Sequence, residues 1–409
     1  MTTIKKPTPK LAPMGIRSRT RWYNFYAMFS ESFTRATLER EAVRRDTVVL
    51  DPWLGSGTTT SIAAELGLPS IGFDINPTMV QISTGRLAHR ERAVEALSQL
   101  ETTRTRTIPS IGSADPLLGW FAPVTARAFR FWQREIAKMC ATDDERSTEG
   151  FLNTALFECA KSLAGSYRSR NPTWLKRPAA NDRIAISSSE VRVAFLKGAE
   201  HRVPLCRELK LPITPQIATG DARHLPLREN TVDVVLTSPP YCTRIDYAVS
   251  TSLELAILGM SDLGLRKLRD ETMGTSTICE RTSVSSDVFG ETCNRFLTQV
   301  EGHTSKASKS YYLKNYLQYF ADLHESLLEI HRCVRPGGTV VIVVQDSVYK
   351  GLHLDLAGII EEISSKVGWP LVARDDFKAL RNMRSINTRS RRYLDDRTAI
   401  ESALTFRTK

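Results

Sequence analysis

The sequence predicts an α/β fold built on a parallel sheet, because short apolar strands alternate with helices and a glycine loop follows the first strand. Residues 47–51 form a β-branched run that ends at an acid. Residues 54–60 (Leu-Gly-Ser-Gly-Thr-Thr-Thr) then precede an alanine-rich helical stretch that ends at Gly67. Residues 70–74 form a second short strand that ends at another acid. Strand, glycine loop, helix and strand make one β-α-β unit of the parallel type.

A long helical stretch interrupts this pattern. From about Pro77 to Pro215 the strand rhythm disappears and the apolar spacing is mostly helical. Residues 261–310 are polar, rich in Ser and Thr and poorly periodic, which predicts a mobile loop or a small variable subdomain. Further strands are expected at 216–221, 232–237, 339–344, 371–373 and 399–406, and helices at about 22–45, 311–334 and 355–367.

These patterns divide the chain into four parts. A basic N-terminal tail (1–22) is followed by the first part of the core (23–85), which contains the glycine loop. A helical basic insertion (86–214) separates it from the second part of the core (215–409), which includes the variable loop. The basic stretch between the last two expected strands carries Arg381, Arg384, Arg389, Arg391 and Arg392.

Composition excludes several classes of protein. The 409 residues are 41% hydrophobic and 25% charged, as in an ordinary globular protein. No run approaches the roughly 18 apolar residues of a membrane helix and the start has no apolar signal-peptide core, so a cytoplasmic protein is expected. The seven cysteines form no C-x-x-C pair, which predicts neither a disulfide framework nor a metal site.

Positive charge points to a polyanionic partner. The net charge is +11, and residues 1–22 alone carry six cations and no acid. Residues 151–213 hold 11 Lys or Arg against 5 acids, with Tyr167 and Trp174 among them. Such cations can contact phosphates while the aromatic rings pack against bases or sugars. A helical face exposed to solvent is the plainer interpretation. The residues we expect to contact nucleic acid are Arg170, Lys176 and Arg177.

The glycine loop narrows the kind of cofactor. A G-x-G after a strand, here Gly55-Ser56-Gly57, serves several nucleotide-containing cofactors. Thr60 replaces the third glycine of the dinucleotide pattern and no Lys follows, so a cofactor without phosphates fits best. Asp74, which closes the second strand, is placed to accept hydrogen bonds from ribose hydroxyls, or else to cap the next helix. Asp221 is similarly placed for an adenine amino group.

A proline motif ends the strand at 232–237. Two prolines in Ser238-Pro239-Pro240-Tyr241 fix the backbone, remove two N–H groups and leave carbonyls pointing outward. The site therefore accepts hydrogen bonds. Acceptors at Ser238 and the Pro239 carbonyl would hold an exocyclic amino group of a base, and Tyr241 offers a stacking face. A turn that merely ends a strand is the alternative.

Three segments together resemble a known family. Residues 51–59 (Asp-Pro-Trp-Leu-Gly-Ser-Gly-Thr-Thr), 71–77 (Ile-Gly-Phe-Asp-Ile-Asn-Pro) and 237–241 (Thr-Ser-Pro-Pro-Tyr) look like those of the S-adenosylmethionine-dependent amino-methyltransferases of DNA. The S-P-P-Y form is similar to cytosine-N4 members, whereas adenine-N6 members more often carry Asp or Asn in place of Ser. The resemblance covers about 22–85 and 215–407.

The resemblance implies a Rossmann-like methyltransferase sheet of seven mostly parallel strands with an antiparallel last strand. It also implies S-adenosyl-L-methionine as cofactor and DNA as partner. The basic insertion between the second and third expected strands departs from the family pattern, so the resemblance does not say which part of the chain recognises the DNA target. The implied catalytic residues are Ser238, Pro239, Pro240 and Tyr241. The implied cofactor-binding residues are Phe25, Asp51, Pro52, Gly55, Gly57, Thr58, Asp74, Asp221 and Ala222.

The sequence thus predicts a site-specific DNA methyltransferase that acts on the N4 amino group of cytosine. Adenine-N6 methylation of DNA and guanine-N2 methylation of RNA are the alternatives, and a non-catalytic DNA-binding subunit is a further one. Cytosine-C5 methylation is disfavoured on chemical grounds, because it needs a cysteine nucleophile, usually in a Pro-Cys pair, and none occurs. A cognate restriction or defence partner is an expectation from the same resemblance, whereas membrane association and oligomeric state receive no support from the residues.

Overall fold

The computed structural model describes residues 7–9, 22–23, 30–42, 44–104, 109–142, 145–167, 175–242, 246–278, 286–378 and 400–409. Phe25, Arg170, most of the N-terminal tail and the basic stretch near residues 381–392 lie outside these ranges. No helix in the described ranges is long and apolar enough to cross a membrane.

A seven-stranded sheet forms the core, in the order β3-β2-β1-β4-β5-β9-β8. The first five strands in this order are parallel, and β9 pairs antiparallel with both β5 and β8. This confirms the mostly parallel sheet with an antiparallel last strand. The strands are β1 (Val49–Asp51), β2 (Ser70–Asp74), β3 (Gln216–Thr219), β4 (Val232–Thr237), β5 (Val334–Gln345), β8 (Leu371–Lys378) and β9 (Ile400–Arg407).

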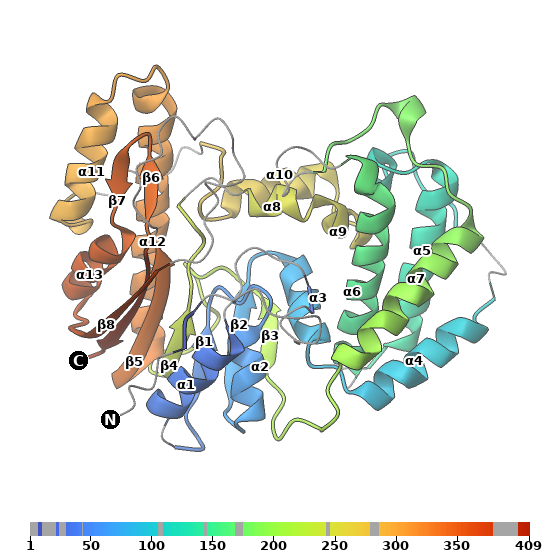
Figure 1. Ribbon diagram of the computed structural model, residues 1–409, viewed down its shortest axis with the longest axis horizontal. Helices are drawn as coiled ribbons and strands as arrows, with labels where there is room; N and C mark the ends of the chain where they lie inside the picture. The colour runs from blue at the N-terminus through green and yellow to red at the C-terminus, as the bar shows by residue number, and fades with distance from the viewer. Residues whose placement is uncertain are drawn as a thin grey trace.

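Helices cover both faces of the sheet (Figure 1). Alternate residues of a central strand point to opposite faces, so β4 directs Val234 to one side and Val235 to the other. The first face packs against α1 (Glu31–Glu41) and α2 (Thr58–Glu65). The second packs against α11 (Glu291–Gly302), α12 (Leu313–Cys333) and α13 (Leu356–Val367). The central strands are therefore apolar on both sides, as parallel strands are expected to be.

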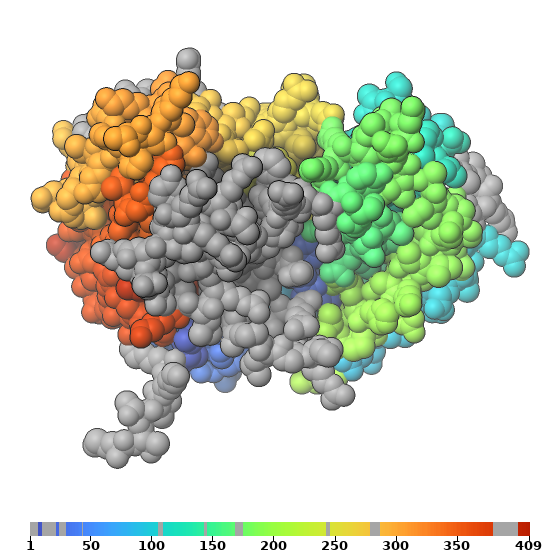
Figure 2. All heavy atoms as spheres, turned by 45° about the horizontal axis from the view of Figure 1, so that its top comes forward, coloured from blue at the N-terminus to red at the C-terminus, as the bar shows by residue number. Residues whose placement is uncertain are grey.

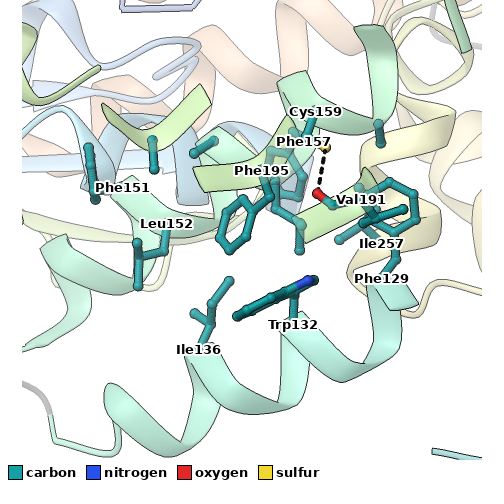
Figure 3. Packing of buried hydrophobic residues seen from close by; sticks show 14 of the residues in the cluster. Phe129, Trp132, Ile136, Phe151, Leu152, Phe157, Cys159, Val191, Phe195 and Ile257 are labelled. Atoms are coloured by element: carbon teal, nitrogen blue, oxygen red, sulfur yellow. Dashed lines mark hydrogen bonds between the residues drawn. The ribbon is translucent and has the colours of Figure 1, made fainter. Parts of the chain in front are cut away.

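The insertion forms a helical lobe with its own core. Its long helices are α4 (Arg90–Thr102), α5 (Pro123–Met139), α6 (Arg146–Leu163) and α7 (Ser188–Arg202). Figure 3 shows Phe129, Trp132, Phe157 and Phe195 packed together between these helices. The lobe adjoins the core where α6 crosses α3 (Pro77–Gly85), and a Cβ atom on Gly85 would lie 2.4 Å from the carbonyl carbon of Gly150.

An arm of short helices runs above α3 in Figure 1 and joins the part of the core beside the sheet to the helical lobe. It consists of α8 (Tyr247–Ser250), α9 (Ser252–Ile257) and α10 (Asp262–Glu271), and it follows the proline motif in the chain. Arg130 of α5 holds the arm, because its guanidinium donates to the carbonyls of Ala256 (2.8 Å) and Ile257 (2.6 Å) at the end of α9. The insertion is thereby attached directly to the segment that follows the motif.

Several boundaries differ from the sequence prediction. Of the two alternatives for residues 261–310, the loop is wrong over α10 and α11, which occupy much of the segment, and the small variable subdomain stays a prediction. These helices are amphipathic, with Phe296, Leu297 and Val300 buried against the core while their polar faces meet solvent. The helix expected from residue 22 begins only after its N-cap Ser30. A two-stranded hairpin, β6 (Ser347–Tyr349) with β7 (Leu352–Leu354), has no counterpart in the sequence prediction.

Candidate functional site

A pocket opens at the carboxyl ends of the parallel strands. Its empty volume, which includes open solvent, is about 1100 Å³. Its lining brings together the proline motif 238–241 and most of the predicted cofactor residues: Asp51, Pro52, Gly55, Thr58, Asp74, Asp221 and Ala222. Acceptors from four different strand ends thus meet in one place, as ligand sites of open α/β sheets commonly do.

Two glycines shape the loop between β1 and α2. Gly55 and Gly57 have φ values of +51° and +75°, which disfavour other residues. A Cβ atom on Gly57 would lie 2.6 Å from the Cβ of Ser83 in α3. Gly57 does not line the pocket; it lets the loop turn tightly into α2 against α3, and Gly55 lines the pocket itself.

Asp74 is half-buried in the pocket and braces the glycine loop. One carboxylate oxygen accepts the Gly55 amide and the other accepts the Asn76 amide, each at 2.9 Å. Burial raises the pKa of Asp74 to about 7, although both hydrogen bonds oppose the shift. The cap of α3 is Asn76, whose side chain accepts from the Thr78 amide. The alternative role of Asp74 as the helix cap is therefore wrong.

Asp51 connects the cofactor loop with the catalytic strand. It is 2% exposed, and its carboxylate accepts from the Thr237 hydroxyl at 2.7 Å and the Trp53 amide at 3.3 Å. Burial raises the pKa of Asp51 to about 6, with the Thr237 hydrogen bond as the largest opposing effect. Thr237 immediately precedes the proline motif, so this contact fixes the motif relative to the glycine loop.

Asp221 has an arginine partner that the sequence did not reveal. The Arg223 guanidinium donates to both carboxylate oxygens of Asp221. Its Nη2 lies 2.6 Å from Oδ2, and its Nε lies 3.0 Å from Oδ1 and 3.1 Å from Oδ2. It also contacts Asp322 of α12 at 2.9 Å and the carbonyl of Glu271 at 2.7 Å. Arg223 therefore ties Asp221 to α12 and to the end of α10, and Asp221 reaches the pocket as part of this network.

Two tyrosines hold the backbone of the proline motif. The Tyr319 hydroxyl of α12 donates to the Pro240 carbonyl at 2.9 Å, and the Tyr241 amide donates to the Tyr247 hydroxyl at 3.2 Å. Within the described ranges, the Ser238 hydroxyl and the Pro239 carbonyl have no protein partner. These are the two acceptors that the sequence assigned to the amino group of a base.

Other pocket residues escaped the sequence analysis. They are Trp53, Leu54, Ser56, Ile75, Asn76, Met79, Gly220, Tyr247, Glu271, Thr272, Met273, Val343 and Glu401. Trp53 could have been found, because it stands inside the glycine-loop motif. Glu401 is 5% exposed on β9, about 160 positions from the motif it approaches, and no local signal marks it. The pKa of Tyr241 is raised mainly by burial, and the electrostatic effects of Tyr247 and Glu401 raise it further.

The two described nucleic-acid candidates have different surroundings. Lys176 is exposed. Arg177 forms a two-point ion pair with Asp262 of α10, at 2.9 and 2.5 Å, and its guanidinium lies 4.8 Å from the ring centre of Trp120. Neither residue lines the pocket.

Comparisons with known proteins point the same way. A family model described as DNA methylase matches residues 23–85. The type II methyltransferase M.BsoBI of Geobacillus stearothermophilus is 21% identical over 85% of this chain and 78% of its own. The type II methyltransferase M.AvaI of Anabaena variabilis is 24% identical over 148 residues, which are 34% of this chain and 30% of its own.

Among solved structures, the putative DNA modification methylase TTHA0409 of Thermus thermophilus in complex with S-adenosyl-L-methionine is 20% identical. The match covers 46% of this chain and 53% of that one, with a TM-score of 0.25. The [4+2]-cyclase SpnF is 10% identical over 92% of this chain and 81% of its own, with a TM-score of 0.35. The DNA methylase match on the cofactor loop and the M.BsoBI match along most of the chain support the S-adenosylmethionine-dependent DNA amino-methyltransferase family.

Proposed function

We propose that this protein transfers a methyl group from S-adenosylmethionine to the N4 amino group of cytosine in DNA. One observation carries the proposal: the glycine loop and the proline motif line the same pocket, and the hydrogen bond from Thr237 to Asp51 joins them. A binding module without catalysis would not need both motifs in one cavity.

The chain's residues fit the cofactor. Its ribose hydroxyls and its amino groups are hydrogen-bond donors, and the pocket presents the carboxylates of Asp51, Asp74 and Asp221. Among the described residues no lysine or arginine lines the pocket, which agrees with a cofactor that carries no phosphate. When bound, S-adenosylmethionine supplies an electrophilic methyl group.

The proline motif would position the base. The Ser238 hydroxyl and the Pro239 carbonyl accept hydrogen bonds from the two amino hydrogens and so orient the nitrogen lone pair towards the methyl group. The ring of Tyr241 packs against the base. A base inside a duplex would have to be flipped out to reach this pocket, at a cost of a few kcal/mol.

The choice of cytosine depends on Ser238. A serine is a neutral acceptor, whereas a carboxylate in its place would attract the developing positive charge on the nitrogen more strongly. The resemblance associates serine here with cytosine, which favours N4 methylation. Adenine-N6 methylation remains the second candidate, since the same pocket accepts any exocyclic amino group.

Nucleoside analysis decides between the two bases. DNA treated with the protein and S-adenosylmethionine is digested and analysed by mass spectrometry. We expect N4-methylcytosine, and N6-methyladenine would refute the choice of base. Ser238→Ala should lower turnover while it spares cofactor affinity, because the hydroxyl contacts only the amino group in this proposal. Full activity of this variant would refute the role of Ser238.

Four sequence predictions stay part of the proposal. Lys176 and Arg177 are expected to contact phosphates, together with Arg170 outside the described ranges, and Phe25 to contact the cofactor. A cytoplasmic location and a cognate restriction or defence partner are likewise expectations. For Arg177 the ion pair with Asp262 adds a requirement, because a phosphate must compete with this carboxylate.

A further inference from the structure

A cluster of lysines stands at the beginning of α12. Lys306, Lys309 and Lys314 lie in or beside the π-helical turn Ser308–Tyr312 and the first turn of α12, and all three are exposed. Residues 302–321 contain no Asp or Glu. In the described part of the chain, none of these three lysines forms an ion pair. We call these residues the lysine cluster.

The helix itself fixes how far this cluster lies from the catalytic motif. Tyr319 touches the Pro240 carbonyl, and Lys314 precedes it by five residues. With a rise of 1.5 Å per residue in α12, Lys314 lies about 8 Å further along the helix axis, and Lys309, in the π-helical turn, lies about one turn beyond it. Since phosphates recur about every 3.4 Å along a strand, these distances correspond to roughly two to five nucleotides.

The backbone that carries the cluster is held firmly. The Tyr311 hydroxyl donates to the carbonyl of Ser276, and Asn315 donates to the carbonyl of Thr275, each at 2.6 Å. Both partners follow closely after Met273 of the pocket wall. The cluster is therefore fixed relative to the pocket rather than carried on a free loop.

The adjacent hairpin supports the cluster from the other side. Ser308 and Tyr349 of β6 share a hydrogen bond of 2.7 Å between their hydroxyls. The ammonium of Lys350 at the hairpin tip lies 5.4 Å from the ring centres of both Tyr312 and Tyr349. Lys350 therefore serves to hold the hairpin against the turn, whereas the three lysines of the cluster are exposed to solvent.

Several cations of the insertion are already occupied by ion pairs, so fewer of them can bind phosphate than its net charge suggests. Lys161, Arg177, Arg202 and Arg207 form ion pairs with Glu254, Asp262, Glu158 and Glu65, respectively. Figure 2 shows the orange region that contains the cluster on one side of the molecule and the green insertion on the other. Uncommitted positive charge thus exists on the side opposite the insertion.

We propose that the lysine cluster binds duplex DNA phosphates that flank the target base. The inference rests on the proposed function, since it takes the pocket to receive a base from that duplex. The cluster acts as a backbone contact and reads no sequence.

The test compares two triple variants that remove the same charge. In the first, Lys306, Lys309 and Lys314 are changed to Gln. In the control, Arg45, Arg228 and Lys409 are changed to Gln; these exposed residues form no ion pair within the described ranges and lie near the amino ends of β1, β4 and β5, opposite the pocket. Affinity for linearised mixed-sequence plasmid DNA is measured over a range of salt concentrations. A third variant with Arg at the three cluster positions tests whether charge alone matters.

We expect the cluster variant to lower the slope of log affinity against log salt by up to about 0.9 per lysine, with a much smaller change in the control. The arginine variant should retain the wild-type slope. Equal slopes in the cluster and control variants would overturn the proposal, and so would a change seen with RNA but not with duplex DNA. Unaltered cofactor affinity in the cluster variant shows that its fold is intact.

The two proposals can fail separately. If wild-type protein yields no methylated nucleoside but the cluster variant shows the smaller slope, the enzyme proposal fails and the DNA contact stands. If methylated cytosine forms and the slope is unchanged, only the contact fails.

Discussion

Cofactor affinity should rise with pH through neutrality, because Asp74 must be ionised to accept a ribose hydroxyl most strongly. Burial raises the pKa of this carboxyl to about 7 in the ligand-free protein. At that pKa roughly one molecule in eleven carries the ionised group at pH 6, and about ten in eleven do so at pH 8. If only the ionised form binds well, affinity at pH 6 is about one tenth of that at pH 8.

Isothermal titration calorimetry with S-adenosylmethionine at these two pH values measures the ratio. Repeating the titration in buffers of different ionisation enthalpy should also reveal proton release below neutrality. Asp74→Asn removes the titrating group and should give a profile that no longer changes tenfold in this interval. It leaves only one oxygen for the amides of Gly55 and Asn76, so a further loss of about 1–3 kcal/mol is expected at every pH.

Affinity that is equal at the two pH values in the wild-type protein would refute the assignment of Asp74 to the ribose. An Asp74→Asn protein whose cofactor affinity still changes tenfold between pH 6 and pH 8 would refute the assignment independently. The stability of the fold should change with pH in the direction opposite to cofactor affinity. A carboxyl with a raised pKa holds its proton more tightly in the folded protein. Asp51 and Asp74 therefore stabilise the ligand-free fold below about pH 4, and this contribution is lost as the pH rises through about 6 for Asp51 and about 7 for Asp74.

Three substitutions test other parts of the site. Tyr241→Ala should remove stacking worth about 1–3 kcal/mol and lower turnover on DNA, with cofactor affinity by calorimetry nearly unchanged; wild-type turnover would contradict the stacking role. Tyr319→Phe should lose the hydrogen bond to the Pro240 carbonyl, about 0.5–1.5 kcal/mol, and lower kcat more than it changes KM for the cofactor; identical kinetics would show that the motif needs no such support. Gly57→Ala should destabilise the protein by about 1–2 kcal/mol from backbone strain, with a further loss from the clash with Ser83, measured by urea denaturation; an unchanged midpoint would contradict the packing described here.

The location of the pocket could be predicted because its acids follow strands. Asp51 and Asp74 close β1 and β2, and Asp221 comes two residues after β3. Carboxyl ends of parallel strands meet at one edge of the sheet, so sequence position alone places these residues together. Long-range partners could not be predicted in this way. Glu401 reaches the pocket only because β9 inserts between β5 and β8.

The expected variable loop shows a second limit. Residues 261–310 look irregular because polar residues dominate their composition, yet Ser261 caps α10 through the Gly264 amide at 3.1 Å. An amphipathic helix on a surface needs only one apolar face, and a few buried residues suffice for it. A low apolar count therefore does not distinguish such a helix from a loop.

Net charge was the least informative prediction, because it does not say which cations are already paired. Arg177 illustrates the consequence. It holds Asp262 at the start of α10, and Glu271 at the other end of this helix lines the pocket. The ten residues of α10 span about 15 Å as a continuous helix, so a phosphate that takes Arg177 from Asp262 would release one end of an element whose other end contacts the site. Replacing Arg177 should therefore affect the pocket as well as DNA affinity, whereas replacing the exposed Lys176 should affect DNA affinity alone.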